Sequence, residues 1–386
     1  MKLLIKLNYN LLFIFAFLLL QFCNSPSTPV ISTEDRTVKV NSIINYETGG
    51  YVRDVKIKNL ILGAAADQNG YFIFNINVND KDSILNLDTL IHNKDIVTSF
   101  DDSAYEIEFS NDGEFAFILD PLDKVYLQPL AYDPAEFPPV TLSTLLRSIE
   151  VGSSNSDKLV FYSLVKHLET LEGDVPSFST SIVTQWCTVD IPYIYSCIET
   201  SIDSLSYYQS NISFSNPYLS SSNDQLGVMV FKQNDNPGCF DNSTEIPDID
   251  KVGCEFMNYT WIDVLEPFAS FDTPATTETV FSYNNYFFAG LSNDKGCYIT
   301  LLDDNGSQIS NLSIAEGYSI NDIHVFNDYM VLACKSDGIL IYEIASGDFN
   351  LLGEIETEYA YSAKFFNNNT IIVGTRQGIQ IINFGD

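Results

Sequence analysis

The chain has 386 residues, of which 51 are Asp or Glu and 19 are Lys or Arg, giving a formal net charge of −32 at pH 7. Such an acidic surface repels nucleic-acid phosphates and anionic lipid headgroups, so the composition argues against a DNA or RNA partner. The charge also favours solubility, and by itself it indicates no particular function.

Residues 1–22 predict an export signal. Lys2 and Lys6 precede an apolar run over residues 11–20 that is too short to span a membrane comfortably. Removing the segment takes these two positive charges away, so the net charge falls by two from −32 to −34.

Cys23 follows this segment directly, and the arrangement resembles the signal of a bacterial lipoprotein. The resemblance implies that Cys23 is lipidated, that residues 23–36 form a polar tether, and that the protein lies at the cell envelope, on the outer membrane or the cell surface. Phe22 stands where the usual signal has a small residue. The alternative is ordinary signal cleavage, which leaves a mature chain that starts at Thr28.

A repeat with a fixed register covers the start and the end of the remaining chain. Counted from an origin in each of four copies, Asn stands five positions on, Gly sixteen on and Ile nineteen on. The origins are Asp54, Val280, Asp322 and Ser362; the Asn are Asn59, Asn285, Asn327 and Asn367; the Gly are Gly70, Gly296, Gly338 and Gly378; the Ile are Ile73, Ile299, Ile341 and Ile381. A period of about 40 residues is typical of propeller blades and helical arrays.

Each copy has the pattern of several short strands. Apolar residues alternate with polar ones, as at Ile323 and Val325, or form short runs, as at 329–333. The repeated Asn and Gly fit turns that need a left-handed backbone. Since a fourth stretch leads to the next copy, the sequence predicts an all-β fold, a β-propeller of four-stranded antiparallel blades. A helical array is disfavoured because Gly, Asn and Asp interrupt every segment.

We expect the ring to be closed by its two ends. The last copy stops after its third strand, near residue 384, while residues 37–46 alternate like a strand and belong to no other blade. Pairing 37–46 with 378–384 completes the last blade and removes an exposed sheet edge. Residues 37–386 then form a single propeller domain.

The spacing of the repeat is lost between residues 131 and 275, where we expect insertions. The number of blades in this region follows from the distance between the repeat origins Asp54 and Val280, which is 226 positions. Four units of about 56 residues favour seven blades in total, while five units of about 45 give eight. Within this region, Ser156 could cap a helix that ends at Gly173, and a strand over 158–165 fits the same residues.

Six further cysteines suggest disulfides in an exported chain. Proximity favours Cys187 with Cys197 across a hairpin and Cys239 with Cys254 around an insertion, which leaves Cys297 and Cys334 to link neighbouring blades. No two of them have the spacing of a zinc knuckle, so we expect no metal there.

Catalytic groups are scarce. The histidines His92, His167 and His324 have no second histidine at ligand spacing and no nucleophile elbow beside them, and His324 falls in the exposed phase of its strand. We expect each to be a surface or packing residue. Gly-rich phosphate loops are absent, so no cofactor is predicted. The acidic loops at 79–82 and 303–306 lack the full order of a calcium loop, and the second is more simply a hairpin turn.

The copies at 54–76, 322–344 and 362–384 resemble LVIVD repeats, a bacterial family of propellers outside the cytoplasm. Their third strands read Gly-Ile-Leu-Ile-Tyr-Glu-Ile from Gly338 and Gly-Ile-Gln-Ile-Ile-Asn-Phe from Gly378. The resemblance covers about four blades and implies an envelope lipoprotein without an assigned reaction. With only two Trp in the chain, blades marked by Trp as in the WD type are disfavoured.

We therefore expect a monomeric, non-catalytic scaffold that binds a protein or glycan partner and touches the membrane only through its N-terminal lipid. Function in such rings lies on loops of one face. The candidate contact residues are the aromatic side chains of the irregular region, with inter-blade packing as their alternative role: Tyr193, Tyr195, Tyr207, Tyr208 and Trp261. The alternative function is a hydrolase or lyase acting on extracellular polysaccharide, with paired carboxylates in the propeller channel.

The lipoprotein interpretation predicts the chemistry of the mature N-terminus. Mass spectrometry of the protein from its native envelope should find residues 1–22 removed and an acylated Cys23. An unmodified chain that starts at Thr28 would contradict the prediction.

Overall fold

The computed structural model describes residues 38–79, 84–94, 103–110, 112–120, 124–131, 140–141, 146–151, 158–169, 177–190, 193–205, 211–223, 225–234, 237–246, 249 and 251–385. They belong to one compact unit, Thr37–Asp386. The signal, Cys23, Tyr207 and Tyr208 lie outside the described residues. No helix in the described ranges is long and apolar enough to cross a membrane.

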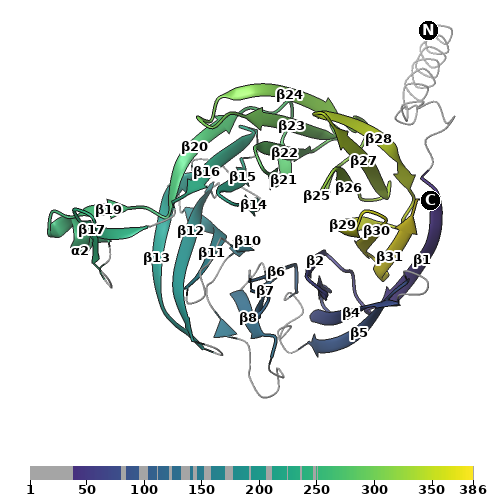
Figure 1. Ribbon diagram of the computed structural model, residues 1–386, viewed down its shortest axis with the longest axis horizontal. Coiled ribbons are helices and arrows are strands. Elements are labelled where there is room, and N and C mark those ends of the chain that lie inside the picture. The colour runs from purple at the N-terminus through teal and green to yellow at the C-terminus, as the bar shows by residue number, and fades with distance from the viewer. Residues whose placement is uncertain are drawn as a thin grey trace, which may run out of the picture. The chain divides into compact units, whose positions relative to one another are not determined.

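The described strands form seven four-stranded antiparallel sheets and one small three-stranded sheet, which confirms the predicted all-β fold. Within five of the seven, each strand pairs with its neighbours in the sequence, and the sheets follow one another around a ring (Figure 1); the other two contain the pairs β16–β20 and β1–β31. The first three are β2–β5 (Asp54–Lys58, Ile61–Ala65, Tyr71–Asn79, Ile84–Asn93), β6–β9 (Glu106–Phe109, Phe115–Asp120, Lys124–Pro129, Val140–Thr141) and β10–β13 (Leu146–Val151, Lys158–Glu169, Ser177–Asp190, Tyr193–Leu205).

The fourth sheet contains an insertion. It consists of β14–β16 (Ile212–Ser215, Tyr218–Ser222, Val228–Gln233) and β20 (Leu265–Phe271), and between β16 and β20 lie β17 (Gly238–Asp241), β18 (Thr244–Ile246), α2 (Lys251–Phe256) and β19 (Thr260–Ile262). Strands β17, β18 and β19 make the three-stranded sheet. The remaining sheets are β21–β24 (Thr277–Tyr283, Tyr286–Leu291, Cys297–Leu302, Gln308–Ile314), β25–β28 (Asp322–Phe326, Tyr329–Ala333, Ile339–Ala345, Asp348–Ile355) and β29–β31 (Ala360–Asn367, Thr370–Thr375, Gly378–Phe384) with β1 (Val40–Glu47).

The predicted closure is confirmed, because β1 pairs antiparallel with β31 as the fourth strand of the last sheet. Gly378 supports this role. A Cβ there would come within 2.1 Å of the Tyr46 carbonyl on β1, just as a Cβ at Gly338 would meet the Ile355 carbonyl on β28 at 2.3 Å. The repeated glycine is therefore needed because the third strand of a blade begins against the backbone of the fourth.

The turn prediction holds in part. Asn59 and Asn327 have a left-handed backbone, with φ of 55° and 52°. In the second copy, whose turn is Asn284–Asn285, the left-handed residue is Asn284, because the strand pairing makes Thr279 the equivalent of Asp54. In the last copy a register shift between Phe365 and Asn367 displaces the turn past Asn367.

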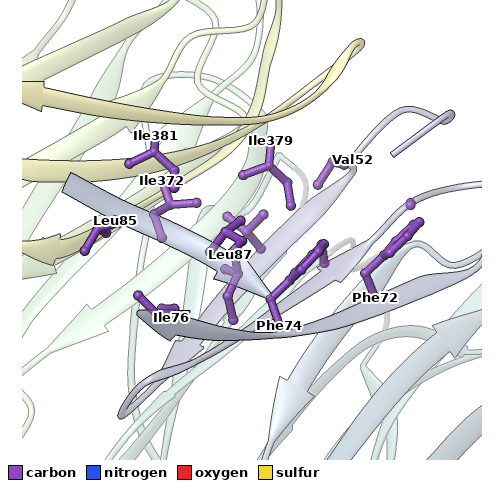
Figure 2. Packing of buried hydrophobic residues seen from close by; sticks show 13 residues of the cluster. Val52, Phe72, Phe74, Ile76, Leu85, Leu87, Ile372, Ile379 and Ile381 are labelled. Atoms are coloured by element: carbon purple, nitrogen blue, oxygen red, sulfur yellow. The ribbon is translucent and has the colours of Figure 1, made fainter. Parts of the chain in front are cut away.

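The isoleucines of the repeat lie in the core, as expected. Ile73, Ile299, Ile341 and Ile381 are all buried. Ile381 packs with Ile372 and Ile379 against Phe74 and Leu87 of the first sheet, so the first and last blades share one apolar cluster (Figure 2). Strand β11 runs over Lys158–Glu169, which decides for the strand and against the helix between Ser156 and Gly173.

Closure by β1 predicts different effects for neighbouring substitutions. Ile44 packs against the shared cluster, whereas Ile43 on the opposite side of β1 is 44% exposed. Ile44→Asp should lower the free energy of unfolding by about 1–2 kcal/mol, and Ile43→Asp by less than about 0.5 kcal/mol. Urea unfolding followed by circular dichroism measures both. Equal losses would contradict the docking of β1 on this cluster.

Candidate functional site

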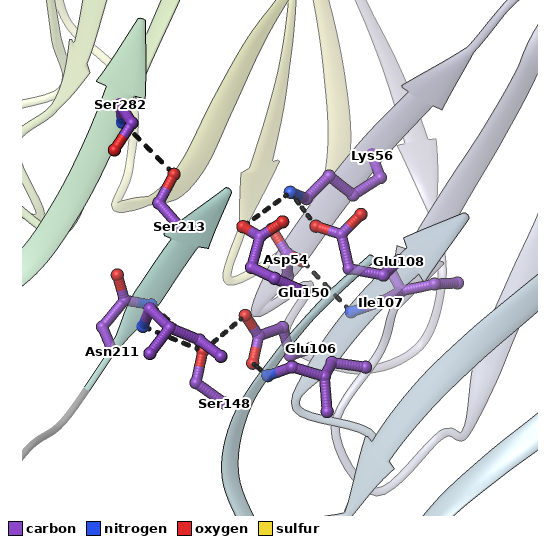
Figure 3. Close-up of polar contacts among 12 residues, drawn as sticks. Asp54, Lys56, Glu106, Ile107, Glu108, Ser148, Glu150, Asn211, Ser213 and Ser282 are labelled. Carbon is purple, nitrogen blue, oxygen red and sulfur yellow. Dashed lines mark hydrogen bonds and ion pairs between the residues drawn. The ribbon is translucent and has the colours of Figure 1, made fainter. Parts of the chain in front are cut away.

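The innermost strand of each blade has one edge that faces the channel without a strand partner. On these strands a polar residue precedes an apolar one, and the polar side chain accepts a hydrogen bond from the backbone N–H of the apolar residue in the next blade (Figure 3). Six such bonds are present: Ile107 N to Asp54 (3.1 Å), Ile149 N to Glu106 (3.1 Å), Ile212 N to Ser148 (3.4 Å), Val280 N to Asn211 (3.0 Å), Ala363 N to Asp322 (3.0 Å) and Val55 N to Ser362 (3.4 Å). We call them the inner hydrogen-bond ring.

The inner hydrogen-bond ring solves a general problem, since a backbone N–H shielded from water must have a partner. It also fixes the offset between adjacent blades. At the seventh junction Ile323 N instead donates to the carboxylate of its own neighbour Asp322. Thr279, the equivalent polar residue there, donates to Asn211.

A cavity of about 380 Å³ opens in the channel beside these residues. Five carboxylates and three lysines among its lining residues make it strongly polar: Asp54, Glu106, Glu150, Glu278, Asp322, Lys56, Lys335 and Lys364. We call this space the channel cavity. No group of three His, Cys, Asp or Glu in the described part of the chain is arranged to hold a metal ion.

Lys56 organises the carboxylates on one side of the cavity. Its Nζ forms ion pairs with Glu108 and, at 3.7 Å, with Glu150. Burial would lower the pKa of Lys56, but these two glutamates raise it well above its usual value. Burial and the charge of Glu108 raise the pKa of Glu150 to about 8. Burial also raises the pKa of Glu106, and the charges of Asp54 and Glu150 add to the effect.

Asp322 and Lys364 form the second charged group. The Asp322 carboxylate accepts from Lys364 Nζ at 2.5 Å and from Ser362 Oγ at 2.7 Å. Burial acts to raise the pKa of Asp322, but Lys364 and these hydrogen bonds lower it overall. His324 lies in the same channel wall, where burial and Lys364 lower its pKa to about 3. The neutral ring accepts a hydrogen bond from Phe365 N at 3.1 Å, so His324 is a packing residue.

Aromatic and cationic side chains gather next to the channel cavity. Tyr51 stacks on Tyr361, and the Arg53 guanidinium lies 5.4 Å and 4.7 Å from the centres of these two rings. Tyr359 contacts Tyr361 and carries Arg376 at 4.3 Å over its ring. We call these five residues the Tyr–Arg surface. Tyr359, Tyr361 and Arg53 also line the channel cavity, together with Tyr105, which is 48% exposed.

Of the aromatic residues singled out from the sequence, the three that the structure describes are not among the residues of the channel cavity or the Tyr–Arg surface. Tyr193 and Tyr195 are on β13, the outermost strand of its sheet, and their side chains are outside the described set. Trp261 is half-buried on β19 of the insertion, where its Nε1 donates to Asp263 at 3.0 Å. It contributes neither to the channel nor to inter-blade packing. The feature of the sequence that could have predicted the channel wall is the polar residue at the first position of a repeat copy, such as Asp54 or Asp322.

The three predicted disulfides have different outcomes in the structure. Cys239 and Cys254 form a disulfide with a Cα–Cα distance of 5.6 Å. Cys187 lies opposite Cys197 in the register of β12 and β13, and their side chains fall outside the described set. The predicted bond between Cys297 and Cys334 is wrong, because both are free and buried. Each packs into the apolar core between two blades, where burial raises the pKa of both thiols.

No family model and no curated protein matches the chain. Solved structures do match in fold. A chain of the mitotic checkpoint complex has a TM-score of 0.57 at 11% identity, covering 94% of this chain and 97% of its own length. The RRP9 WD40 repeats give 0.56 at 9% identity, with 90% and 99% covered. The WD40 β-propeller domain of Doa1 gives 0.52 at 12% identity, with 91% and 97% covered. At these identities the likeness shows the fold alone, and the chain is a β-propeller.

The raised pKa of Glu150 predicts a pH dependence of stability. The folded protein keeps the Glu150 proton up to about pH 8, while an unfolded glutamate releases it near 4.5. The folded state therefore binds more protons in this window, and stability falls as pH rises from 4.5 towards 8, by up to about 1.4 kcal/mol per pH unit. Asp54, Glu106 and Glu108, whose pKa values burial also raises, act in the same direction.

Glu150→Gln should flatten this dependence. Urea unfolding at several pH values between about 5 and 8 measures the slope for the native chain and the variant. Glu266→Gln, at an exposed position on β20, is the matched control and should leave the slope unchanged. Part of the slope should remain, because Asp54, Glu106 and Glu108 act in the same direction. A slope as steep as that of the native chain would contradict the assignment.

Proposed function

We propose that this β-propeller is an exported, lipid-anchored binding scaffold of the bacterial cell envelope, and that its partner is a protein or a glycan. The observation that carries the proposal is the Tyr–Arg surface beside the channel cavity. Tyr51 of this surface is 46% exposed, and Tyr105, which lines the channel cavity beside it, is 48% exposed. Tyr and Arg are the residues most enriched at the energetic centres of protein interfaces, and aromatic faces also accept sugar rings.

The Tyr–Arg surface is fixed before a partner arrives. Arg53 donates to Asp67 at 3.1 Å and 2.9 Å from Nε and Nη2, so its guanidinium is held over the Tyr51 and Tyr361 rings. Lys335 and Glu278 form an ion pair of 3.0 Å elsewhere on the rim of the cavity. Side chains that are already ordered lose little conformational entropy on binding, which favours affinity.

The channel carboxylates support a scaffold more than an enzyme. Asp54, Glu106 and Asp322 each accept a backbone N–H of the next blade, so the inner hydrogen-bond ring occupies them. A carboxylate that takes part in proton transfer must instead be free to reach a substrate atom. The net charge of −32 continues to argue against nucleic acid as the partner.

The scaffold proposal is tested by removing the exposed rings. Tyr51→Ala combined with Tyr105→Ala should weaken binding by about tenfold or more, because truncated aromatic hot spots cost about 2 kcal/mol or more. Binding is measured by capture from solubilised native envelope and on arrays of envelope glycans. Ile309→Ala, 61% exposed on β24, is the control and should bind like the native chain. Undiminished binding by the double variant would contradict the proposed face.

A polysaccharide hydrolase or lyase is the second candidate, and one observation favours it. Glu106 and Glu150 both line the channel cavity, the charge of Glu150 adds to the raised pKa of Glu106, and burial raises the pKa of Glu150 to about 8, as expected for a general acid. Under this hypothesis the native chain releases new sugar ends from envelope polysaccharide and Glu150→Gln abolishes the release. The Glu266→Gln control should retain activity. No release by the native chain would leave the scaffold as the function.

A further inference from the structure

The insertion in the fourth blade lies away from the channel, on the outer side of the ring (Figure 1). Its short helix α2 ends at Phe256, and Asn258, two residues on, has a left-handed backbone with φ of 57°. Met257 N donates to Gly253 O at 3.1 Å and Tyr259 N donates to Cys254 O at 3.0 Å, so the last turn is closed by its own hydrogen bonds.

One side of α2 is fixed to the small sheet. Cys254 is fully buried and is bonded to Cys239 of β17, and Cys239 lies opposite Trp261 of β19 in the register. Lys251 Nζ donates to both carboxylate oxygens of Asp263, at 3.1 Å and 3.2 Å, which ties the start of the helix to the end of β19. The covalent bond and the ion pair together hold the helix in one orientation.

The free side of α2 presents large apolar side chains to solvent. Phe256 is 86% exposed and Val252 is 75% exposed, the two highest values for large hydrophobic residues in the described part of the chain. They are four positions apart and therefore neighbours on the helix surface, and Met257, 49% exposed, follows directly. We call these three residues the apolar knob. Apolar side chains gathered in one exposed place usually mark an interaction site.

The insertion that carries the apolar knob is acidic. Asp241, Glu245, Glu255 and Asp263 are exposed in the insertion, and the charge of Lys251 is already compensated by Asp263. An apolar centre with a charged rim is the pattern of a protein interface. An anionic bilayer would be repelled by this rim, and a second copy of the chain would bring the same negative charges against it.

We infer that the apolar knob is a docking site for a partner protein, which meets it with an amphipathic helix whose apolar stripe is bordered by Lys and Arg. Phe256 is the anchor, Val252 and Met257 extend the contact, and the exposed carboxylates pair with the basic flanks. This site is separate from the Tyr–Arg surface and does not depend on the proposed function. It gives the molecule a second place of attachment on its outer side.

The experiment uses the whole chain with its disulfide intact and three dye-labelled helical peptides of about five turns. The first has a Leu stripe flanked by Lys, the second has the same stripe flanked by Glu, and the third has Ala in place of Leu and keeps the Lys. Fluorescence anisotropy at about 0.15 M salt measures their binding. The Leu/Lys peptide should bind about tenfold or more tightly than either of the other two.

The variants separate the apolar knob from general charge attraction. Val252→Ser with Phe256→Ser should lower Leu/Lys affinity about tenfold, to the level of the Ala/Lys peptide, while Phe256→Leu should keep most of it. Leu60→Ser with Ile309→Ser, which are 55% and 61% exposed elsewhere, are matched controls and should change nothing. The Tyr51 and Tyr105 variants should also bind the peptide normally, so this inference and the proposed function can fail independently.

Three outcomes would overturn the inference. One is full affinity of the Leu/Lys peptide for the Val252 and Phe256 double variant. Another is binding of the native chain, but not of the double variant, to phosphatidylcholine or phosphatidylglycerol vesicles, which would assign the apolar knob to a membrane. The third is concentration-dependent dimerisation in sedimentation experiments that the double variant loses, which would assign it to a second copy of the chain. Because the substituted side chains are exposed, the variant should fold normally, and circular dichroism checks this.

Discussion

The structure depends on how the channel-facing edges of the inner strands are satisfied. A blade ends at the channel with an edge strand, and its N–H groups need partners that the next blade cannot supply by strand pairing. The inner hydrogen-bond ring supplies them through polar side chains on the inner strand of the preceding blade, as Asp54 accepts from Ile107 N and Glu106 accepts from Ile149 N. Each bond joins two neighbouring blades, so the offset between them follows from the same contact.

This constraint explains why charged residues are concentrated where a propeller is most enclosed. Asp and Glu reach across to the next blade and accept N–H groups well, but their burial raises the pKa of Asp54, Glu106 and Glu150. Lys56 and Lys364 offset part of the negative charge. The channel is therefore polar because of how the ring is assembled, and a polar channel alone is weak support for catalysis.

The two proposed attachment surfaces lie mostly where the chain is not required for the ring. The Tyr–Arg surface uses the segments that lead into inner strands and the turn between β30 and β31, and the apolar knob uses an insertion between two strands of one blade. Both can change in sequence without altering the strand pairing. The disulfide between Cys239 and Cys254 lies in the insertion, where a small sheet and a short helix have little core of their own.

The sequence by itself determined the blade, the glycines at Gly70, Gly296, Gly338 and Gly378, the core isoleucines and the closure by residues 37–46, because all of these follow from local periodicity and turn chemistry. It did not show that Asn284 is the left-handed residue of its turn, and it wrongly joined Cys297 to Cys334, since a change of strand register and the spacing of side chains between blades leave no local pattern. Only the tertiary structure decided that Asp54, Glu106 and Asp322 hold neighbouring blades together, that His324 is a neutral packing residue, and that Trp261 lies in an outer insertion. These contacts join residues from different blades or place whole segments in space, and their geometry exists only when the ring is complete.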